Sequence, residues 1–415
     1  MQICLVGATH ASFNPRLVRE ADALVDAGYE VRVVAPLYLP CADSREAALM
    51  ENRGWRLQTV DFRPRGLSSI RALAIRARRR IAEEIYRHWP TPAMAALGYA
   101  MAVPELHGLA AREPADWFIA HTQAALPAAA EAARRWDARL GFDCEDLLAY
   151  AHDERRHMVR AIEAEYIRDC DYVSAASEAM AERLVSDYGI ADPVVLYNVF
   201  PLELTKQMTP PRKRPLRSSV RLHWFGQTIG PGRGIEEAVE AMGHLPPEVE
   251  LHLRGYPAAG FRSKLADLAE TKSVAARVFF HPPVAHDELI GTLDEFDVGL
   301  ALERPEHGNY ARTVTNKVFS YMLGGLAIAA TDTPGQREVL EQVPAAGFLY
   351  SAGQVDALAS RLAEWIGDRQ RLRAAQQAAW DAARARFCWD VEKQKFLGLF
   401  GAGVEQPMAA LAEAR

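Results

Sequence analysis

Short apolar segments alternate with amphipathic segments along most of the chain. Residues 2–6 form a short apolar run that ends at Gly7, and a helical pattern follows from Pro15 to Gly28. A second apolar run occupies residues 31–35. A strand, a helix and a strand within about 35 residues predict a right-handed βαβ unit of a parallel sheet. Proline suits the first turn of a helix and glycine its C-terminal end, so Pro15 and Gly28 set the expected limits of the helix.

The same alternation predicts two α/β halves. In the first half we expect strands at residues 56–62, 117–121, 140–143, 172–175 and 194–197, and helices at 127–136, 153–169 and 178–188. In the second half we expect strands at 221–225, 250–254, 277–281, 298–302, 327–330 and 348–350, and helices at 234–242, 261–270, 286–295, 316–323, 335–341, 355–366, 369–386 and 390–400. This order is typical of Rossmann-like, doubly wound parallel sheets covered by helices on both faces.

The two halves are separated by residues 201–219, which contain four prolines and a basic cluster without apolar periodicity. Such a segment is typical of a linker between domains. We therefore expect an N-terminal domain over residues 1–200, a linker over 201–219 and a C-terminal domain over 220–386. A final helix and tail would occupy residues 387–415.

Composition is that of an ordinary globular protein, with 49% hydrophobic and 25% charged residues and a formal net charge of −6. These values exclude a disordered or coiled-coil chain, and the acidic balance argues against nucleic acid as a partner. The five cysteines show no metal-ligand spacing, so we expect reduced thiols. No signal peptide is recognisable, and the longest apolar stretch, residues 93–103, is far below the ~20 residues that span a bilayer. We expect a cytoplasmic protein with at most peripheral contact with the inner face of the membrane.

A basic stretch runs from Arg63 to Arg80 and contains seven arginines and no acidic residue. Five apolar residues fall on one face of a helix drawn through this region: Ile70, Leu73, Ala77, Ile81 and Ile85. A basic amphipathic helix in an acidic protein is typical of contact with an anionic membrane surface. The alternative is a solvated helix that packs on its own domain.

A glycine-rich turn opens the second half. Gly226 and Gln227 follow the expected strand at 221–225, and Gly232, Arg233 and Gly234 come just before a helix. Such a turn presents free backbone N–H groups and the positive end of a helix dipole, which together can hold a phosphate. The guanidinium of Arg233 adds a charged fork for phosphate oxygens. The turn lacks G-K-[ST] and is not a Walker loop, and a plain tight turn is the alternative.

A second helix start of this kind lies further along the chain. Arg312, Thr313, Asn316 and Lys317 supply two cations, a hydroxyl and an amide there. Two such helix starts in one domain favour a diphosphate ligand over a monophosphate. A solvated surface lysine is the alternative for Lys317.

Candidate acceptor-side residues lie at strand ends of the first half. His121 ends the expected strand at 117–121, and Asp143, Glu145 and Asp146 lie at the end of the next one. Ligands of open α/β sheets bind at the carboxyl ends of the strands. The acids can accept hydrogen bonds from sugar hydroxyls or act as a general base, with helix capping as the alternative for Asp143 and Asp146. His121 can act in catalysis, orient an acceptor or be purely structural.

The first strand-to-helix loop, residues 7–14, lacks G-x-G-x-x-G, and no acidic residue closes the second strand. A dinucleotide site in the first half is therefore not expected. Thr9, His10 and Asn14 of this loop are candidate contacts for an acceptor, and a plain connecting loop is the alternative.

With these features assembled, the sequence resembles the GT-B glycosyltransferases, in particular the nucleotide-sugar-dependent family 4. The resemblance covers nearly the full length and rests on the order and spacing of several short segments. These are NPRLVREA (14–21), AGYEV (27–31), AHT (120–122), ALPA (125–128), AASE (175–178), YN (197–198), GRG (232–234), LRG (253–255) and FCWD (387–390).

The resemblance implies two domains that face a cleft, with a C-terminal helix that returns to the N-terminal domain. It implies that the first domain binds the acceptor and the second binds the nucleotide sugar, with no cofactor and no metal. The implied donor residues are Gly226, Gln227, Gly232, Arg233, Glu303, Arg312, Thr313, Asn316, Lys317 and Ser320. The implied acceptor residues are Thr9, His10, Asn14, Asp143 and Glu145, and the implied catalytic residues are His121, Arg233 and Lys317.

The sequence departs from the family pattern at two places. Gln227 stands where the family usually has the first of two phosphate-binding cations, and Arg233 takes the second position. The two positions of the family's E-x7-E pair are Arg312 and Ser320, so the carboxylate expected on the donor ribose is replaced. Glu303 or Glu306 from the preceding loop would be its substitute.

The resemblance implies transfer of a sugar from a nucleotide-sugar donor to a hydroxyl of a glycan, lipid-linked or small-molecule acceptor, as in polysaccharide or glycoconjugate biosynthesis. A retaining, metal-independent reaction is expected, in which helix ends and basic side chains stabilise the leaving diphosphate. An inverting reaction would need His121, Asp143 or Glu145 as a base. The alternatives are a catalytically weak GT-B-like binding protein and a sugar-nucleotide epimerase.

Overall fold

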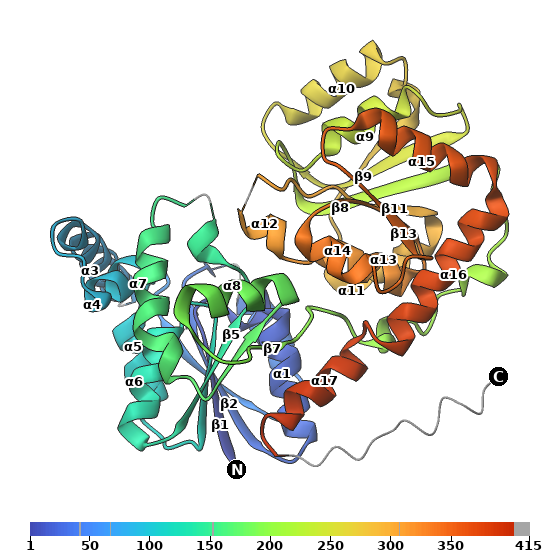
Figure 1. Cartoon of the computed structure of the whole chain (residues 1–415). Coiled ribbons are helices and arrows are strands. Elements are labelled where there is room, and N and C mark those ends of the chain that lie inside the picture. Colours follow the sequence, from blue (N-terminus) through green and yellow to red (C-terminus); the bar gives the residue numbers. More distant parts are fainter. Residues whose placement is uncertain (41–42, 67, 152, 307, 402–415) are drawn as a thin grey trace. The chain divides into compact units, whose positions relative to one another are not determined.

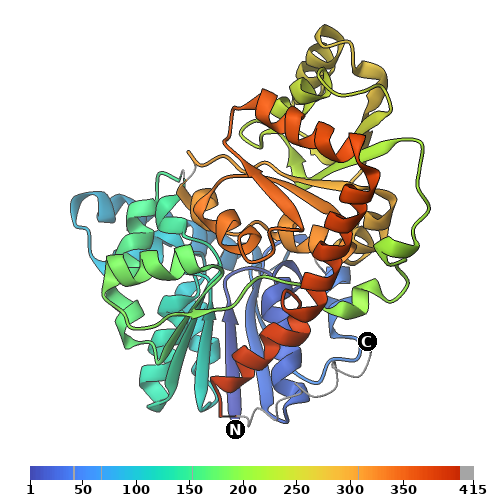
Figure 2. The same cartoon turned by 45° about the vertical axis from the view of Figure 1, so that its right-hand side comes forward.

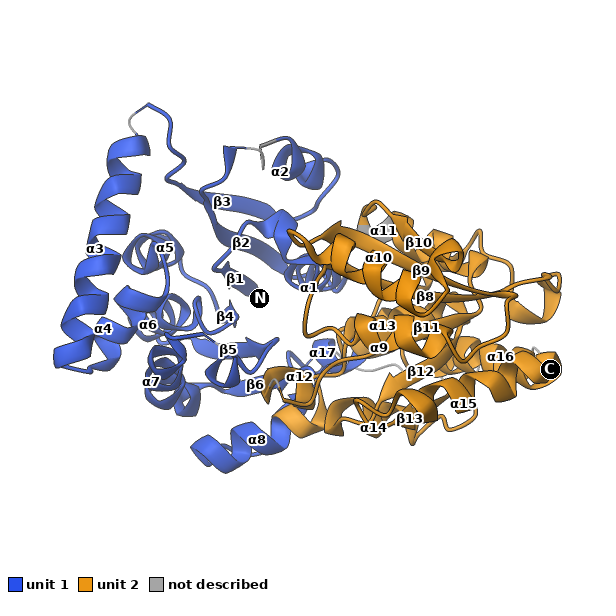
Figure 3. Cartoon of the chain, turned by 90° about the horizontal axis from the view of Figure 1, so that it is seen from above, with its two compact units in different colours: residues 1–176, 181–196, 393–415 blue, residues 177–180, 197–392 orange. Residues whose placement is uncertain are grey.

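The computed structural model describes residues 1–40, 43–66, 68–151, 153–306 and 308–401. The chain folds into two compact units, which are coloured separately in Figure 3. Unit 1 comprises Met1–Ala176, Ala181–Leu196 and the described residues from Lys393 onward, and unit 2 comprises Ser177–Met180 and Tyr197–Glu392. Each unit contains one parallel sheet with helices on both sides (Figure 1), which confirms the expected α/β fold with two doubly wound domains.

The sheet of unit 1 has seven strands in the order β3-β2-β1-β4-β5-β6-β7, and every neighbouring pair is parallel. Its strands are β1 (Gln2–Gly7), β2 (Glu30–Leu37), β3 (Arg56–Asp61), β4 (Trp117–His121), β5 (Arg139–Cys144), β6 (Tyr172–Ala175) and β7 (Val194–Val195). Its helices are α1 (Pro15–Asp26), α2 (Asp43–Met50), α3 (Ser68–His88), α4 (Pro92–Tyr99), α5 (Val103–Ala110), α6 (Leu126–Trp136), α7 (Arg156–Tyr166) and most of α8 (Glu178–Tyr188).

Helices cover both faces of this sheet. Figure 1 shows α1 on one side of the strands and α5 and α6 on the other, and Figure 2 shows the strands side by side. The central strand β4 is buried along its whole length, as the apolar run of residues 117–120 predicts. Because the strands are parallel, their carboxyl ends meet at one edge of the sheet, where the candidate acceptor residues lie.

The signals that delimit the first helix act as expected. The Oδ1 atom of Asn14 accepts hydrogen bonds from the backbone N–H groups of Arg16 (3.1 Å) and Leu17 (3.0 Å), and Pro15 takes the first helical position. Gly28 follows the helix with φ of 86°, a conformation that glycine adopts without steric cost. The cap fixes where α1 begins and so fixes which of its side chains face the sheet.

The sheet of unit 2 has six strands in the order β10-β9-β8-β11-β12-β13, again all parallel. Its strands are β8 (Val220–Ile229), β9 (Val249–Pro257), β10 (Val278–His281), β11 (Val298–Ala301), β12 (Ala327–Thr331) and β13 (Gly347–Tyr350). Its helices are α9 (Ile235–Met242), α10 (Phe261–Thr271), α11 (His286–Thr292), α12 (Gly308–Arg312), α13 (Asn316–Gly324), α14 (Pro334–Leu340), α15 (Val355–Gly367) and α16 (Arg369–Ala385).

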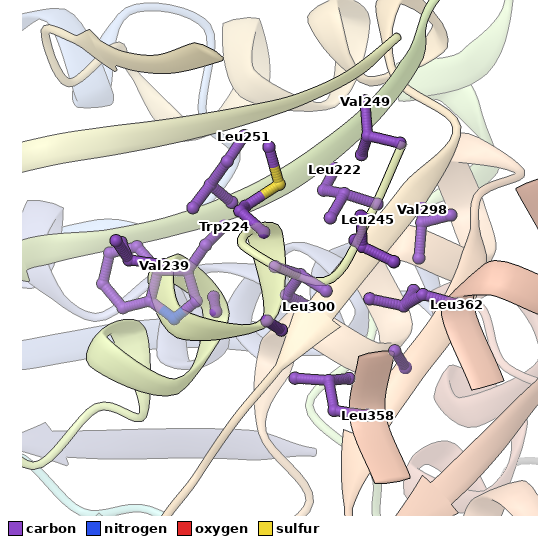
Figure 4. Close-up of a cluster of buried hydrophobic side chains, with 14 of the residues drawn as sticks. Leu222, Trp224, Val239, Leu245, Val249, Leu251, Val298, Leu300, Leu358 and Leu362 are labelled. Atoms are coloured by element: carbon purple, nitrogen blue, oxygen red, sulfur yellow. The ribbon is translucent and has the colours of Figure 1, made fainter. Parts of the chain in front are cut away.

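One face of the second sheet buries a continuous apolar cluster against α9, α10 and α15. Figure 4 shows part of it: Leu222 and Trp224 of β8, Leu251 of β9, Val298 and Leu300 of β11, Val239 of α9, and Leu358 and Leu362 of α15. Full burial of one leucine-sized side chain stabilises a fold by roughly 1.5–3 kcal/mol. The cluster therefore holds β8 and β11, whose ends carry the candidate donor residues, in one rigid layer.

Strand β8 is longer than expected. Its pairing with β9 is interrupted between Phe225 and Thr228 and then resumes as far as Ile229. Gly226 and Gln227 therefore lie in an irregular part of the strand, and the turn proper begins at Gly230. The backbones approach closely here, because a Cβ atom on Gly255 would lie 2.3 Å from the carbonyl oxygen of Gly226. A bulge bends the strand without changing its composition, which is why apolar periodicity did not reveal it.

The C-terminal helix α17 (Trp389–Gly398) begins in unit 2 and ends in unit 1. Beyond it, the ring of Phe400 lies edge-on to Trp117 and Tyr172, with centroids 5.3 Å and 6.0 Å away. The hydroxyl of Tyr29 donates a hydrogen bond to the carbonyl oxygen of Phe400 (3.3 Å). These contacts confirm the expected return of the C-terminal helix to the N-terminal domain.

Several short elements escaped the sequence pattern. Helices α2, α4, α5 and α12 have five to eight residues each, too few turns for a clear helical period. The segment 201–219 groups with unit 2 and contains two short 3-10 helices, Leu202–Thr205 and Pro211–Lys213. The guanidinium of Arg214 donates to the carbonyl oxygens of Gly324 and Gly325, which ties this segment to the end of α13. The domain limits drawn from the sequence stay a prediction.

Three histidines lie across neighbouring strands of unit 2. His223 of β8 and His252 of β9 are in register, and the Nδ1 atom of His252 lies 2.9 Å from the Nε2 atom of His281. The ring of His223 is stacked on Phe296, with centroids 4.0 Å apart, and is completely buried. Burial, helped by the positive charge of Arg254, lowers the pKa of His223 to about 3. Burial also lowers the pKa of His252 and of His281.

We expect the stability of unit 2 to fall on mild acidification because of His223. An unfolded histidine binds a proton below pH ~6.5, while the folded one stays neutral down to about pH 3, so unfolding takes up a proton in this window. Stability is then fully present above pH ~6.5, and His223 alone removes about 2 kcal/mol between pH 7 and pH 5. Urea unfolding at a series of pH values, followed by hydrogen exchange in β8, measures the slope. His223→Phe should flatten it, whereas His244→Phe, at an exposed histidine, should not; equal slopes in both would contradict the assignment.

Candidate functional site

A polar cluster lies at the carboxyl ends of β4, β5 and β6 in unit 1. The strand register places His121 beside Asp143, and Asp143 beside Ser174. All three side chains are buried, and the hydroxyl of Ser174 donates to the Oδ1 atom of Asp143 (2.6 Å). The sequence order predicted that His121 and Asp143 would meet at this edge, and the parallel register brings them together.

Arg16 of α1 is the centre of this cluster. Its Nε and Nη2 atoms donate to the two carboxylate oxygens of Asp143 at 2.6 Å and 2.7 Å, and its Nη1 atom donates to the carbonyl oxygen of Leu196 at 2.7 Å. Glu20, one turn further along α1, lies 3.5 Å from Nε of Arg16. Burial opposes the charge on both partners, but Arg16 and His121 hold the pKa of Asp143 well below its usual range. The two-pronged pair keeps Asp143 ionised inside the unit.

His121 is enclosed by carboxylates. Its Nε2 atom lies 3.2 Å from Glu20, and its Nδ1 atom lies 3.4 Å from Asp143 and 3.5 Å from Glu145. Burial alone would lower the pKa of His121, but these carboxylates raise it well above its ordinary value. Burial and the charge of Asp143 in turn raise the pKa of Glu20. The surrounding carboxylates therefore favour the protonated form of His121.

Two further candidate acceptor residues join this cluster. The Nδ2 atom of Asn14 donates to the Oε1 atom of Glu145 (2.5 Å), while its Oδ1 atom caps α1. Glu145 is the partly exposed member, whereas Asn14, His121 and Asp143 are buried. Any acceptor that reaches the cluster in this structure therefore meets Glu145.

The other two acceptor candidates lie in a different setting. His10 is buried, and its Nε2 atom accepts hydrogen bonds from the backbone N–H groups of Tyr38 (3.2 Å) and Leu39 (3.1 Å). Burial lowers the pKa of His10, so a neutral ring accepts these bonds. The side chain ties the first loop to the end of β2, and Thr9 beside it is exposed. No contact in the described part of the chain joins Thr9 or His10 to the His121 cluster.

Glu20, His121 and Asp143 have ligand atoms within 4.8 Å of one another, close enough to hold a metal ion. A metal at Asp143 would compete with Arg16, which donates to both carboxylate oxygens, and with Ser174. The guanidinium thus already supplies the positive charge that the two acids require. The donor set fits an internal ion network better than a metal centre.

In unit 2 the glycine-rich turn lies between β8 and α9. Gly232 and Gly234 have φ of 74° and 67°, and a Cβ atom on Gly234 would lie 2.5 Å from the carbonyl oxygen of Leu302. Only glycine allows this approach, which presses the turn against the segment that follows β11. The guanidinium of Arg233 is half-buried and lies 5.1 Å from the ring centroid of Tyr310 in α12. The turn and Arg233 thus face the loop that leads to α13.

Lys317, at the start of α13, is buried and paired. Its Nζ atom donates to the Oε1 atom of Glu303 (2.5 Å), lies 3.4 Å from the hydroxyl of Thr315, and is 5.3 Å from the ring centroid of Trp224. The alternative of a solvated surface lysine is therefore wrong. An ammonium has three N–H donors, so this contact with Glu303 leaves donors for a ligand. Glu303, the proposed substitute for the ribose carboxylate, is buried as well.

Three polar atoms near this pair have no hydrogen-bond partner among the described residues. They are the Oε2 atom of Glu303, the hydroxyl of Ser320 and the indole Nε1 atom of Trp224, and all three are buried. A buried polar group without a partner costs roughly 1–3 kcal/mol of stability. Such atoms are typical of sites whose partners are supplied by water or a ligand.

The remaining donor candidates are arranged around α12 and α13. Thr313 donates from its hydroxyl to the carbonyl oxygen of Asn309 (3.0 Å), and Arg312 donates to that of Gly308 (3.3 Å). Asn316 is exposed. Gln227 is exposed in the irregular part of β8, with Gly226 next to it. Because their side chains are exposed, Asn316 and Gln227 are accessible to a ligand.

Sequence reasoning missed Arg16, Glu20, Ser174 and Trp224. Arg16 and Glu20 are one turn apart on α1, and a charged pair on the apolar side of a helix was the signal that could have found them. Ser174 lies beside Asp143 because of the register between β5 and β6, and this register cannot be determined from the sequence. From the sequence, Trp224 is an ordinary core residue of a strand. Only the structure reveals that its indole nitrogen has no hydrogen-bond partner among the described residues.

Two family models match the chain. A glycosyltransferase family 4 model matches residues 16–204, and a model of glycosyl transferases group 1 matches residues 220–368. The comparison with curated proteins by sequence finds no match.

Solved structures share the fold. HepE from Anabaena, solved with UDP, has a TM-score of 0.68 and 19% identity, and the match covers 97% of this chain and all of HepE. A sucrose-phosphate synthase from Thermosynechococcus elongatus has a TM-score of 0.68 and 15% identity, covering 97% of this chain and 100% of that one. A glycosyltransferase from Rickettsia africae has a TM-score of 0.66 and 13% identity, covering 96% and 97%. With the two family matches, one on each half, the chain belongs to the nucleotide-sugar-dependent glycosyltransferases of GT-B fold and family 4 type.

Proposed function

We propose that this enzyme transfers a sugar from a nucleotide-diphosphate donor to a hydroxyl of a glycan, lipid-linked or small-molecule acceptor. The observation that carries the proposal is the arrangement in unit 2. A turn with two glycines at positive φ precedes α9, Arg233 lies beside it, and Lys317 begins α13. Backbone N–H groups with two cations suit the charge that develops on a leaving diphosphate.

The nucleotide to test first is a uridine diphosphate. The structures of HepE contain UDP and UDP-glucose, and a structure of a TarM variant from S. aureus contains UDP. Thermal shift with UDP, GDP, ADP and TDP compares the candidates directly. Saturation at 100 times Kd stabilises a protein by ~2.7 kcal/mol, which is readily measured. Stabilisation by none of these nucleotides would contradict a donor site.

The state of the acids in unit 1 favours retention of the anomeric configuration. An inverting transferase needs a base that takes the proton of the acceptor hydroxyl. The carboxylates around His121 favour its protonated form because they raise its pKa, and Arg16 favours the ionised form of Asp143 because it lowers the pKa of that carboxyl. Neither suits the role of base, so an inverting reaction would depend on Glu145, the partly exposed member of this group. We propose a retaining reaction that uses no metal, with His121 as a positioning charge behind Glu145. Determination of the product anomer by NMR tests this.

Arg233→Ala is expected to lower kcat/KM by about 10²-fold, because one charged donor to the transition state is lost. Arg233→Lys should recover part of the activity, since it keeps the charge but not the two-pronged geometry. Initial rates with a nucleotide-sugar donor measure the effect. The matched control is Arg262→Ala, which removes another arginine that faces an aromatic ring, 4.9 Å from the centroid of Phe280. Wild-type rates for Arg233→Ala would show that the turn does not hold the donor phosphates.

A second candidate function is that of a nucleotide-binding protein with weak catalysis. It is favoured by the burial of Lys317 against Glu303 and by the replacement of the family's glutamate pair with Arg312 and Ser320. Such a protein would be stabilised by a nucleotide and yet form no product with a panel of nucleotide sugars and acceptors. Mass spectrometry of the reaction mixtures separates the two functions.

We propose a cytoplasmic location for this enzyme. None of the described helices combines the length and the apolar character of a membrane span.

A further inference from the structure

The long helix α3 has two apolar faces, and only one of them is used inside unit 1. Ala72, Ile75, Ala82 and Tyr86 are buried on the face that packs against the unit, where α4 is the main neighbour. In Figure 3 α3 lies along the edge of unit 1 beside α4. The alternative from the sequence, a helix that packs on its own domain, therefore accounts for one face of α3 only.

The second face carries an exposed apolar stripe. We use this name for Ile70, Leu73, Ile81 and Ile85 of α3 with Trp89, the residue after it, which are exposed by 69%, 68%, 60%, 39% and 70%. Each residue of a helix advances by about 100°, so Ile70, Leu73, Ile81 and Ile85 cluster within about 120°, opposite the buried face. Isolated exposed apolar residues are ordinary on protein surfaces, but apolar residues repeated on one face of a 21-residue helix are typical of a contact site. The carboxylate of Glu84 falls on the same face near the end of the helix, where it is paired with Arg87.

Arginines flank the stripe on both sides. By the same helical geometry Arg71 and Arg78 lie on one side, and Arg76, Arg80 and Arg87 on the other. Arg78 is paired with Glu105, and Arg87 with Glu84. Arg76 and Arg80 are exposed and make no hydrogen bond or ion pair with any residue in the described part of the chain. The first turn of the helix has no acidic residue.

We propose that α3 docks unit 1 on an anionic lipid surface, with the stripe among the acyl chains and the arginines at the phosphate level. A helix with an apolar face bordered by cations lies in a membrane interface with that face buried by roughly 5–10 Å. Tryptophan favours the same interface, which suits Trp89 at the end of the stripe. A second copy of this chain is the weaker occupant, because stripe-to-stripe contact would bring two sets of arginines together. The docking is independent of which sugar the enzyme transfers.

Vesicle co-sedimentation of the full-length protein tests the proposal. We expect binding to vesicles of phosphatidylcholine with 30% phosphatidylglycerol, and little to phosphatidylcholine alone. Arg76→Ala with Arg80→Ala should weaken binding about 30-fold, and raised salt should weaken it further. Leu73→Glu with Ile81→Glu should reduce it at least about tenfold, because two buried apolar side chains are lost. All of these positions are on the surface, so the melting temperature should stay unchanged.

Matched controls come from exposed positions elsewhere. Leu216→Glu changes an equally exposed leucine of unit 2, and Arg112→Ala removes an exposed arginine of unit 1 outside α3. Neither should affect vesicle binding. Equal binding to neutral and anionic vesicles, or equal binding by the stripe variant and wild type, would overturn the proposal. A dimer in light scattering that Leu73→Glu with Ile81→Glu dissociates would assign the stripe to a second copy instead and would also overturn it.

Discussion

Lys317→Met is expected to lower the rate of sugar transfer by about 10²–10³-fold and also to destabilise unit 2. The activity falls because a cation at the start of α13 no longer stabilises the leaving diphosphate. The stability falls because the carboxylate of Glu303, buried and bonded to Lys317 at 2.5 Å, is left without its partner. Removal of one member of a buried ion pair typically costs 3–5 kcal/mol. Steady-state rates and thermal unfolding measure the two effects.

A paired variant separates these two consequences. Lys317→Met with Glu303→Gln removes both charges, so the stability should return towards that of the wild type while transfer stays low. Glu303→Gln alone keeps the ammonium and should retain more activity than either variant without Lys317. Transfer at the wild-type rate by the double variant would show that Lys317 is a purely structural residue. Donor binding should then be unchanged too, which thermal shift with UDP reports.

Arg16→Met is expected to destabilise unit 1 by about 3–5 kcal/mol at pH 7. The variant leaves Asp143 buried and ionised and deprives Glu20 of a cation 3.5 Å away. The deficit should shrink on acidification. Arg16 and His121 depress the folded pKa of Asp143, so its contribution is present above the unfolded value of ~4 and is lost as the pH falls below it. Urea unfolding at pH 7 and at pH 3 measures the change.

Arg16→Met with Asp143→Leu is the matched control, because it removes both charges of the pair. It should be more stable than Arg16→Met alone, as expected when a buried pair is replaced by apolar groups. An Arg16→Met protein as stable as the wild type at pH 7 would show that the network contributes nothing to the fold.

Much of the fold was predictable because the strands of a parallel sheet, buried on both faces, appear in the sequence as short continuous apolar segments. The strand at 117–121 and the strand at 172–175 agree with the structure residue for residue. The expected helices at 316–323 and 355–366 are each one residue shorter than the observed ones. What escaped was local geometry: the bulge after Phe225, the extension of β9 to Pro257, and short helices such as α12. None of these changes the apolar period.

The site was predictable in its position and not in its electrostatics. Parallel topology alone places His121 and Asp143 at one edge, as the register shows. The sequence could not show that Arg16 would reach Asp143 from α1, or that Lys317 would be drawn into a pair with Glu303. Both depend on which side chains a helix turns inward, and a shift of one residue in a cap would change the answer. The partners of buried charged side chains can therefore be identified only from the three-dimensional structure.

The anchoring of Phe400 on Trp117 and Tyr172 has a consequence for any attempt to dissect the gene. Unit 1 is built from the first part of the chain and from its last helical turns, so a fragment that stops at Leu196 would expose those aromatic rings. A stop codon before Lys393 would therefore destabilise unit 1, although most of unit 1 is encoded at the other end of the gene. Expression of unit 1 by itself would require the closing segment to be supplied as a second polypeptide or fused by circular permutation.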